Sequence, residues 1–559
     1  MVKNIFKLLQ REVSGLHQAA YLLGFFAICS QVLALFRDRL LASTFGANHT
    51  LDLYYSAFRI PDVIFVTAAS IVSLSVLIPF LMERMEKGEV EAKKFLDSVF
   101  TFFFCFMIGV GALAYMLAPY ILKALFPVFA SSSSFGDLVH LTRILLLSPV
   151  FLGFSNLLAS VTQIHKRFFL YALSPVVYNV GIMFGITVLY PVIGISGLGW
   201  GVALGAFLHF GIQVPFVISK RMLPKLSFPM GFSSIRRIIL TSLPRTFTVS
   251  SNELAELFLI SFASFLVPGS ISIFNFSFNL QSVPFSIIGV SYSLAAFPTL
   301  TRLFSSGNRE EFREQMITSS RHIIFWSVPM TVMFVVLRAQ IVRTILGSGR
   351  FNWDDTRLTA AALAIFTVSL IAQNLMTLFV RSYYSRGKTV PPLIMNMLSA
   401  AGIVGLSYYF VYVFQHHLFF QNFMESLLKV SGIPGTVVLM LPLGFTLGVF
   451  INLLLHWVDF NKDFPTYSRP VLRALFHVSG ASIIMGFVTY RALAVFDHVF
   501  NINTAAGIFF QGFTAGILGI IMALCVLYLL KNEELLEVWK TLHKKIWKAR
   551  VVGPDAGMQ

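Results

Sequence analysis

Long apolar runs separated by short polar segments restrict the fold of this sequence more than any other feature. A helix needs about 20 apolar residues to cross the hydrocarbon core of a bilayer. In lipid, only helices and closed barrels pair all of their backbone groups, and runs of this length indicate helices. Charged residues make up 12% of the 559 residues, about half of their share in a soluble domain. We therefore expect an all-α polytopic membrane protein.

Fourteen spans are predicted, and the Lys and Arg residues between them orient the chain. The spans are 16–44, 57–82, 96–124, 139–162, 168–190, 195–219, 238–266, 271–300, 321–345, 358–384, 390–413, 434–457, 472–496 and 504–530. With a cytoplasmic N-terminus, thirty of the 42 Lys and Arg residues lie in cytoplasmic segments and seven in outer ones. Cytoplasmic loops are rich in Lys and Arg, so both termini are predicted to be cytoplasmic. This distribution accounts for the net charge of +17, and no nucleic-acid partner is expected.

The sequence matches itself at an offset of about 220 residues, which indicates an internal repeat of six spans. The matched positions include Pro79 with Pro298, Gly88 with Gly307, and Pro175 and Asn179 with Pro392 and Asn396. Parallel six-span halves are typical of transporters whose cargo binds between the halves. The predicted domains are an N-terminal lobe at 1–225, a C-terminal lobe at 226–457, two added helices within 458–530, and a cytoplasmic basic tail at 531–559.

Several of the predicted spans carry charged and amide side chains, which are rare at membrane depth unless they line a cavity or meet a partner. The first span ends in three consecutive charges, the second contains an arginine, and the seventh and eighth carry polar stripes at helical spacing. These four spans are repeat equivalents, so a shared central cavity is predicted. The candidate substrate-binding residues are Arg37, Asp38, Arg39, Arg59, Arg245, Asn252, Glu253, Glu256, Asn275 and Asn279.

Structural roles are the alternative for several of these residues. Arg39 and Arg59 fit an arrangement in which they only extend to the outer membrane interface. Arg37 and Asp38 fit a local ion pair at the end of the first span. The carboxylates of the seventh span, at 253 and 256, fit a stabilising pair with Arg245.

The arginines favour an anionic cargo, because a guanidinium group binds phosphate oxygens bidentately and stays charged. No nucleotide-binding loop, metal-ligand cluster or catalytic triad is present in the sequence, and its three cysteines lie far apart in apolar runs. We therefore expect a transporter and not an enzyme, without a cofactor, and driven by a coupling ion or the membrane potential.

The segment SQVLALFRDRLLASTFGANHTLDLYYSAFRIPD, from Ser30 to Asp62, resembles the N-terminal signature of the MurJ (MviN) family. The segments FASFLVPGSIS at 262–272 and VPFSIIGVSYSLAAFPTLTRL at 283–303 are also similar to that family. The family consists of bacterial lipid II flippases of the multidrug/oligosaccharidyl-lipid/polysaccharide exporter superfamily.

The resemblance implies that lipid II, an undecaprenyl-pyrophosphate carrying a disaccharide-pentapeptide, moves from the cytoplasmic to the periplasmic leaflet of the inner membrane by alternating access. Arg37 and Asp38 would carry the family's Arg-Asp pair. The added helices would form a groove for the lipid tail. Lipid II, membrane lipids and cell-wall synthesis proteins are the partners that the resemblance implies.

The sequence departs from the family pattern at positions where charges are usual. Phe65, Val66 and Ser70 replace charges of the second span, and Phe278 and Asn279 lie at or near an Asp-Arg pair of the eighth. Three alternatives therefore stay open beside lipid II transport. They are a flippase for another polyprenyl-linked glycan, an ion-coupled small-molecule antiporter using Asp38 or Asp62, and a non-transporting scaffold of a cell-envelope complex.

Overall fold

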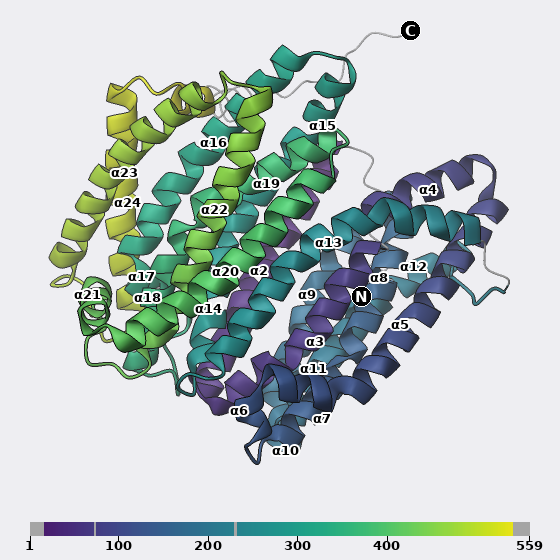
Figure 1. The fold of residues 1–559 in the computed structure, drawn as a ribbon, viewed down its shortest axis with the longest axis horizontal. Coiled ribbons are helices and arrows are strands. Elements are labelled where there is room, and N and C mark those ends of the chain that lie inside the picture. The colour runs from purple at the N-terminus through teal and green to yellow at the C-terminus, as the bar shows by residue number, and fades with distance from the viewer. Residues whose placement is uncertain (1–15, 72–73, 229–231, 540–559) are drawn as a thin grey trace, which may run out of the picture. The chain divides into compact units, whose positions relative to one another are not determined.

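The computed structural model describes residues 16–71, 74–228 and 232–539, and in these ranges every regular element is a helix (Figure 1). The first part contains α2 (Leu16–Phe45), α3 (His49–Ile71), α4 (Leu74–Glu86), α5 (Glu89–Leu125), α6 (Pro127–Ala130), α7 (Phe135–Leu145), α8 (Leu147–Ile164), α9 (Phe168–Phe184), the π-helix η1 (Gly185–Leu189), α10 (Tyr190–Ile193), α11 (Ser196–Gly211) and α12 (Val214–Ser219). The second part contains α13 (Phe232–Ala263), α14 (Ser270–Phe285), the π-helix η2 (Ser286–Val290), α15 (Ser291–Ser305), α16 (Arg309–Val336), α17 (Arg338–Ile345), α18 (Trp353–Val368), α19 (Leu370–Ser385), α20 (Val390–His416), α21 (Leu418–Leu428), the 3-10 helix η3 (Thr436–Leu439), α22 (Met440–Asp463), α23 (Ser468–Phe496) and α24 (Ala505–Leu529). The predicted all-α class is confirmed.

Ten helical stretches of the described chain are long and apolar enough to cross a membrane, or eleven if the bent pair α18–α19 is one span. Each of them corresponds to one predicted span. The three remaining predictions, 16–44, 57–82 and 238–266, coincide with α2, with α3 and α4 together, and with α13. These helices carry most of the charged candidate residues. The protein is a multi-pass membrane protein, and the count of fourteen stays a prediction.

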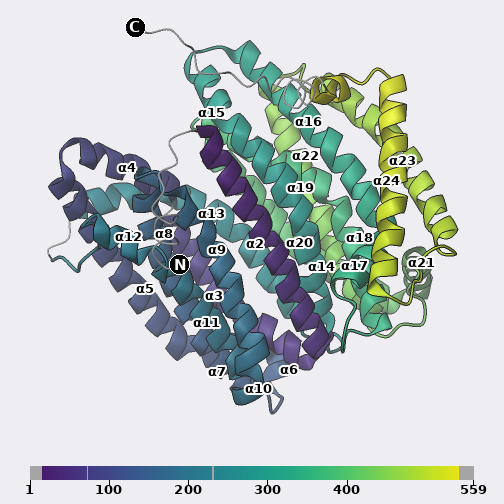
Figure 2. The same cartoon turned by 180° about the vertical axis from the view of Figure 1, so that it is seen from behind.

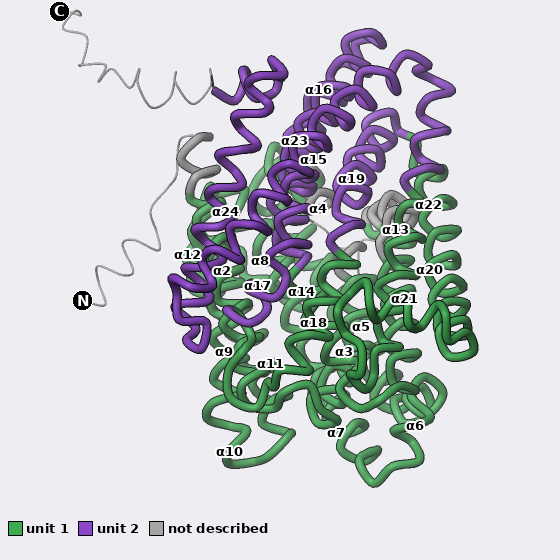
Figure 3. The backbone as a smooth tube through the Cα atoms, turned by 90° about the vertical axis from the view of Figure 1, so that its left-hand side faces the viewer, with its two compact units in different colours: residues 1–280, 345–366, 388–452 green, residues 281–344, 367–387, 453–559 purple. Residues whose placement is uncertain are grey.

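The chain forms two compact units (Figure 3). Unit 1 consists of residues 1–280, 345–366 and 388–452, and unit 2 of residues 281–344, 367–387 and 453–559. All ten candidate residues lie in unit 1. The division into lobes at 225 and 457 was predicted from the repeat and stays a prediction.

In unit 1, α9 and the π-helix η1 that continues it pack backbone against backbone with α11. A Cβ atom added at Gly201 would lie 2.4 Å from Cα of Gly185, and one added at Gly181 would lie 2.3 Å from Cα of Gly205. Small residues let membrane helices approach this closely. On its other side α9 packs against α2, as Figure 2 shows. The glycine contact therefore fixes the helix that supplies Tyr178 and Asn179 to the site below.

A buried carboxylate fixes the start of α14 against α3. Both carboxylate oxygens of Asp52, in the first turn of α3, accept hydrogen bonds. The donors are the backbone N–H of Gly269 at 2.6 Å, the backbone N–H of Ser272 at 2.8 Å and the Ser272 hydroxyl at 2.6 Å. The first N–H groups of a helix have no partner within the helix and favour a negative charge. Asp52 thus sets the position from which α14 extends Asn275 and Asn279.

In unit 2, α23 packs against both α16 and α24. Thr489 of α23 bonds to the carbonyl of Met485 and to the sulfur of Met333 on α16, which leaves room only for a glycine at position 519 of α24. At the end of α24, Lys531 adopts φ 51°, and the chain turns into a helical segment over 533–539. Arg321 of α16 binds this segment through Glu533 and Glu534.

Candidate functional site: a polar cavity in unit 1

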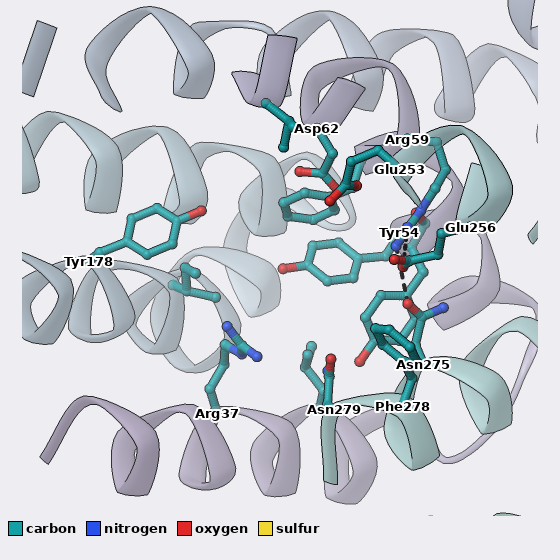
Figure 4. Close-up of a pocket in the computed structure, with 15 residues that line it drawn as sticks. Arg37, Tyr54, Arg59, Asp62, Tyr178, Glu253, Glu256, Asn275, Phe278 and Asn279 are labelled. Atoms are coloured by element: carbon teal, nitrogen blue, oxygen red, sulfur yellow. Dashed lines mark hydrogen bonds and ion pairs between the residues drawn. The ribbon is translucent and has the colours of Figure 1, made fainter. Parts of the chain in front are cut away.

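Side chains from five helices line a cavity of about 300 Å³ in unit 1 (Figure 4). Its lining combines charged, amide and aromatic side chains. From α2 come Arg37 and Leu41, from α3 Tyr54, Tyr55, Phe58, Arg59, Asp62 and Val66, from α9 Tyr178 and Ile182, from α13 Glu253 and Glu256, and from α14 Asn275, Phe278 and Asn279. Because α2 and α3 belong to the first predicted repeat and α13 and α14 to the second, the cavity lies where sequence analysis predicts it.

Arg59 joins three helices at one side of the cavity. Its Nη1 donates to Oε1 of Glu256 on α13 at 2.6 Å, and its Nη2 donates to Oδ1 of Asn275 on α14 at 3.1 Å. Its Nε donates to the carbonyl oxygen of Tyr55 at 3.2 Å. The Arg59 side chain is 8% exposed, so it does not extend to the interface, and that alternative is wrong. Opposite charge and amide oxygens together satisfy this buried guanidinium.

Arg37 and Asp38 form the local ion pair that was the alternative reading, but the pair is also part of the cavity. Nε and Nη2 of Arg37 donate to Oδ1 of Asp38 at 3.0 and 2.8 Å. Nη1 of Arg37 donates to Oδ1 of Asn179 on α9 at 3.3 Å. The other oxygen of Asp38 accepts from Nδ2 of Asn279 on α14 at 3.1 Å. The pair therefore links α2 to α9 and α14.

The lining holds more carboxylates than arginines. Asp62 and Glu253 lie beside the Arg59–Glu256 pair, across the cavity from Arg37 (Figure 4). Two guanidinium groups thus face three carboxylates. The described lining therefore does not carry an excess of cationic side chains, because acidic side chains of α3 and α13 share the faces that present the arginines.

Three tyrosines complete the polar lining, and sequence analysis did not select them. Tyr54 and Tyr55 lie one helical turn before Arg59, and Tyr178 points into the cavity from α9 (Figure 4). Tyr55 is 7% exposed, and its hydroxyl has no hydrogen-bond partner among the described residues. The spacing of Tyr55, Arg59 and Asp62, at i, i+4 and i+7, is a signal that could have identified Tyr55.

A model of the family described as "Lipid II flippase MurJ" matches residues 41–510, which is most of the chain. The chain belongs to the MurJ family. A lipid II flippase MurJ of Burkholderia cenocepacia is 25% identical over 386 residues, covering 66% of this chain and 74% of the relative. A probable lipid II flippase MurJ of Bdellovibrio bacteriovorus is 25% identical over 504 residues, covering 87% and 91%.

Solved structures show the same fold. A lipid II flippase MurJ in an inward closed conformation superposes with a TM-score of 0.72 at 21% identity, covering 92% of this chain and all of that one. An inward-facing multidrug transporter of the MATE family has a TM-score of 0.62 at 15% identity, covering 78% and 96%. An outward-facing one has a TM-score of 0.57 at 13% identity, covering 82% and 100%. Proteins with this fold have therefore been solved in both inward-facing and outward-facing conformations.

Six of the ten candidate residues line the cavity of this MurJ family member. They are Arg37, Arg59, Glu253, Glu256, Asn275 and Asn279. Asp38 is 3% exposed and lies behind Arg37 as its ion partner. Val66 and Phe278 also line the cavity, and both are apolar. They occupy positions at or near which the MurJ family pattern has charged residues.

Two further candidate residues, Arg39 and Asn252, are described by the structure and lie outside the cavity lining. Arg39 donates from Nη1 to the carbonyl oxygen of Ile345 at 3.1 Å, so it binds the chain outside the cavity. Asn252 is exposed and does not line the cavity. The side chain of Arg245 lies outside the described residues, so its pairing with Glu253 or Glu256 stays a prediction. Within the described ranges, no group of three His, Cys, Asp or Glu side chains is arranged to hold a metal ion.

Proposed function

We propose that the protein moves lipid II from the cytoplasmic to the periplasmic leaflet by alternating access. The observation that carries this proposal is the polar cavity lined by Arg37 and Arg59 in a member of the MurJ family. A diphosphate head cannot cross hydrocarbon without compensation for its lost hydration. Two guanidinium groups that face one cavity supply that compensation.

Binding of a diphosphate requires the arginines to exchange partners. Arg59 is held by Glu256, and Arg37 is held by Asp38. A phosphate oxygen that reaches Arg59 replaces the Glu256 oxygen, and the freed carboxylate must turn away or take up a proton. The Tyr55 hydroxyl is a buried donor without a partner in the described chain, and a phosphate oxygen would satisfy it.

The cavity must open to admit the rest of the headgroup. Its volume of about 300 Å³ is at the lower end of the range for small-molecule sites. A disaccharide-pentapeptide therefore needs a wider state than the one described. The inward-facing and outward-facing relatives of this fold support such a change.

The setting follows from the same proposal. The protein would act in the bacterial inner membrane with both termini in the cytoplasm, as the Lys and Arg distribution predicts. It would work as a transporter and not as an enzyme. A coupling ion or the membrane potential would drive the cycle. Lipid II would be the cargo, and cell-wall synthesis proteins and membrane lipids would be its neighbours.

The excess of carboxylates in the lining favours a second candidate function. Two arginines that are already neutralised hold a diphosphate less tightly than free ones. Apolar groups also replace usual charges at Val66 and Phe278. A flippase for another polyprenyl-linked glycan, or a non-transporting cell-envelope scaffold, fits these departures.

Complementation separates the candidates. A native lipid II flippase is depleted in a bacterial host, this protein is supplied in trans, and both survival and lipid II exposure outside the cell are measured. Lipid II transport predicts rescue that is lost in Arg37→Ala and kept in Arg469→Ala, a charge deletion at an exposed position of α23. Full membrane expression without rescue would contradict the proposal and favour the second candidate.

A further inference from the structure

A second polar cavity, of about 200 Å³, lies in unit 2 beside the middle of α16, the start of α23 and the end of α24. It shares no residue with the cavity described above. Its lining consists of Arg321 from α16, Pro470, Arg473, Ala474 and His477 from α23, and Leu530, Lys531, Asn532, Glu533 and Glu534 from the end of α24 and the segment after it. Three cationic side chains and a histidine thus face two carboxylates.

The two carboxylates are already used by one of the cations. Nε of Arg321 donates to Oε1 of Glu534 at 2.5 Å, and its Nη2 donates to Oε2 of Glu533 at 2.5 Å. Glu534 is 3% exposed, so this carboxylate is held at the floor of the cavity. Within the described ranges, neither Arg473 nor Lys531 has a carboxylate within 4.0 Å. The cavity therefore offers two cationic side chains to an anion.

The left-handed turn after α24 directs Lys531 into this cavity. The backbone N–H of Lys531 donates to the carbonyl of Tyr528, and that of Asn532 donates to the carbonyl of Leu527. The Asn532 side chain then accepts from the backbone N–H of Leu535 at 2.9 Å. Both ends of the turn are thus fixed by hydrogen bonds, and the position of Lys531 is built into the fold.

The cavity lies at the level where lipid headgroups are expected. Arg473 and His477 fall at the start of the predicted span 472–496, and Lys531 directly follows the predicted span 504–530. Large apolar side chains adjoin them and are exposed, namely Leu472 and Phe476 on α23 and Leu529 at the end of α24. Basic pockets between helices on the cytoplasmic side bind anionic lipid heads. A lipid bound here would therefore contact cationic side chains with its headgroup and exposed apolar side chains with its acyl chains.

We propose that this cavity binds the phosphate group of an anionic glycerophospholipid of the cytoplasmic leaflet, with Arg473 and Lys531 as its cationic contacts and the exposed faces of α23 and α24 against its acyl chains. The proposal requires a membrane-spanning chain but does not depend on lipid II as the cargo. Free phosphate has the same charge chemistry and lacks the chains, so it is expected to bind far more weakly.

Native mass spectrometry of the purified full chain in detergent tests this proposal, with dioleoylphosphatidylglycerol as the probe and dioleoylphosphatidylcholine as the neutral comparison. Each cationic side chain near a membrane surface strengthens binding about fivefold. Arg473→Gln and Lys531→Gln are each expected to weaken phosphatidylglycerol binding by about that factor. Glu533→Gln removes a negative charge and frees part of Arg321, so it is expected to tighten binding by a similar factor. A loss of structure would not produce this gain.

Three controls decide the result. Arg469→Gln removes an exposed charge one turn before Arg473 on the same helix and outside the lining, and binding is expected to stay unchanged. Arg37→Ala alters only the cavity of unit 1 and is also expected to leave binding unchanged. Millimolar inorganic phosphate is expected not to displace the lipid. Equal binding of the two lipids, equal loss in Arg469→Gln, loss in Arg37→Ala, or displacement by phosphate would each overturn the proposal.

Discussion

The guanidinium of Arg59 on α3 and the carboxylate of Glu256 on α13 meet at 2.6 Å, although 197 positions separate them in the sequence. The contact joins the two predicted repeats of the chain at the wall of the cavity. Removal of one member of a buried ion pair leaves the other charge without a partner, which costs about 3–5 kcal/mol.

Arg59→Gln is expected to lower the thermal stability of the detergent-purified protein, because Glu256 then loses its ion partner. Glu256→Gln is expected to act in the same direction. The double variant is expected to recover part of the loss, because both charges are gone and an amide pair remains. Thermal unfolding of the four proteins gives the coupling energy. Additive losses would show that the pair does not stabilise the fold.

Asp38→Asn is expected to abolish complementation while the protein still reaches the membrane. Asp38 holds Arg37 through Oδ1 and α14 through Asn279, so its removal takes away the contact that positions the guanidinium and loosens one wall of the cavity. Survival after flippase depletion is the measurement. Asp354→Asn serves as the matched control, because Asp354 is an exposed aspartate outside the cavity lining. Full rescue by Asp38→Asn would contradict the assigned role.

Asp52→Ala is expected to destabilise unit 1 by on the order of 3 kcal/mol, since it removes the acceptor of three hydrogen bonds at the start of α14. Ser272→Ala removes only the hydroxyl donor and is expected to cost about 1 kcal/mol. Thermal unfolding in detergent measures both. An equal effect of the two substitutions would show that the backbone contacts of Asp52 contribute nothing.

Gly201→Ala is expected to separate α9 from α11, because the added methyl would lie 2.4 Å from Cα of Gly185. Overpacking of this kind costs about 1–3 kcal/mol. Gly211→Ala, at the end of the same helix, places its methyl in open space and is the control. Expression level and melting temperature report the difference. Equal stability of the two variants would contradict the close contact.

Acid is expected to weaken the link between α16 and the segment after α24. Arg321 donates a hydrogen bond to Glu533 and so lowers the pKa of this carboxyl below its ordinary value. The stabilisation is complete above the ordinary pKa of about 4.3 and is lost as the pH falls through the lowered pKa. Because Glu533 is exposed, the effect is below about 1 kcal/mol.

The melting temperature of the wild type should therefore fall more steeply than that of Glu533→Gln as the pH drops from 6 toward 3. Parallel curves would show that this ion pair does not stabilise the fold.

Sequence analysis located the cavity because its clearest signal, charge within an apolar run, is also the physical requirement for a polar chamber in lipid. Two of its candidate residues, Arg37 and Arg59, line this cavity, and Asp38 lies behind Arg37, while their role in substrate binding stays a prediction. The partner of Arg59 was not predicted. Partners across the chain depend on how α3 and α13 pack, and no local pattern gives that information. Arg39 lies outside the cavity lining for a related reason. It is two positions from Arg37, which places it on another face of α2.

The aromatic lining and the charge balance were less accessible to the sequence. Tyr178 lies on a helix that reads as apolar, and only the glycine contact between α9 and α11 turns it toward the site. Glu253 and Glu256 of α13 were recognised as candidates. Their combination with Asp62 into a lining with more carboxylates than arginines was not predicted, because it depends on which side chains line the same cavity. Helical periodicity shows on which face of its own helix a residue lies, but it does not show which residues of other helices lie opposite.

The excess of carboxylates in the unit 1 cavity has a consequence for energetics. A cargo that brings two further negative charges into this chamber raises the electrostatic cost of every carboxylate that stays ionised there. Protons or cations must then enter with the cargo, or the acidic side chains must withdraw. In the proposed transport cycle, the net charge that would move with each transported molecule depends on Asp62, Glu253 and Glu256 as much as on the arginines.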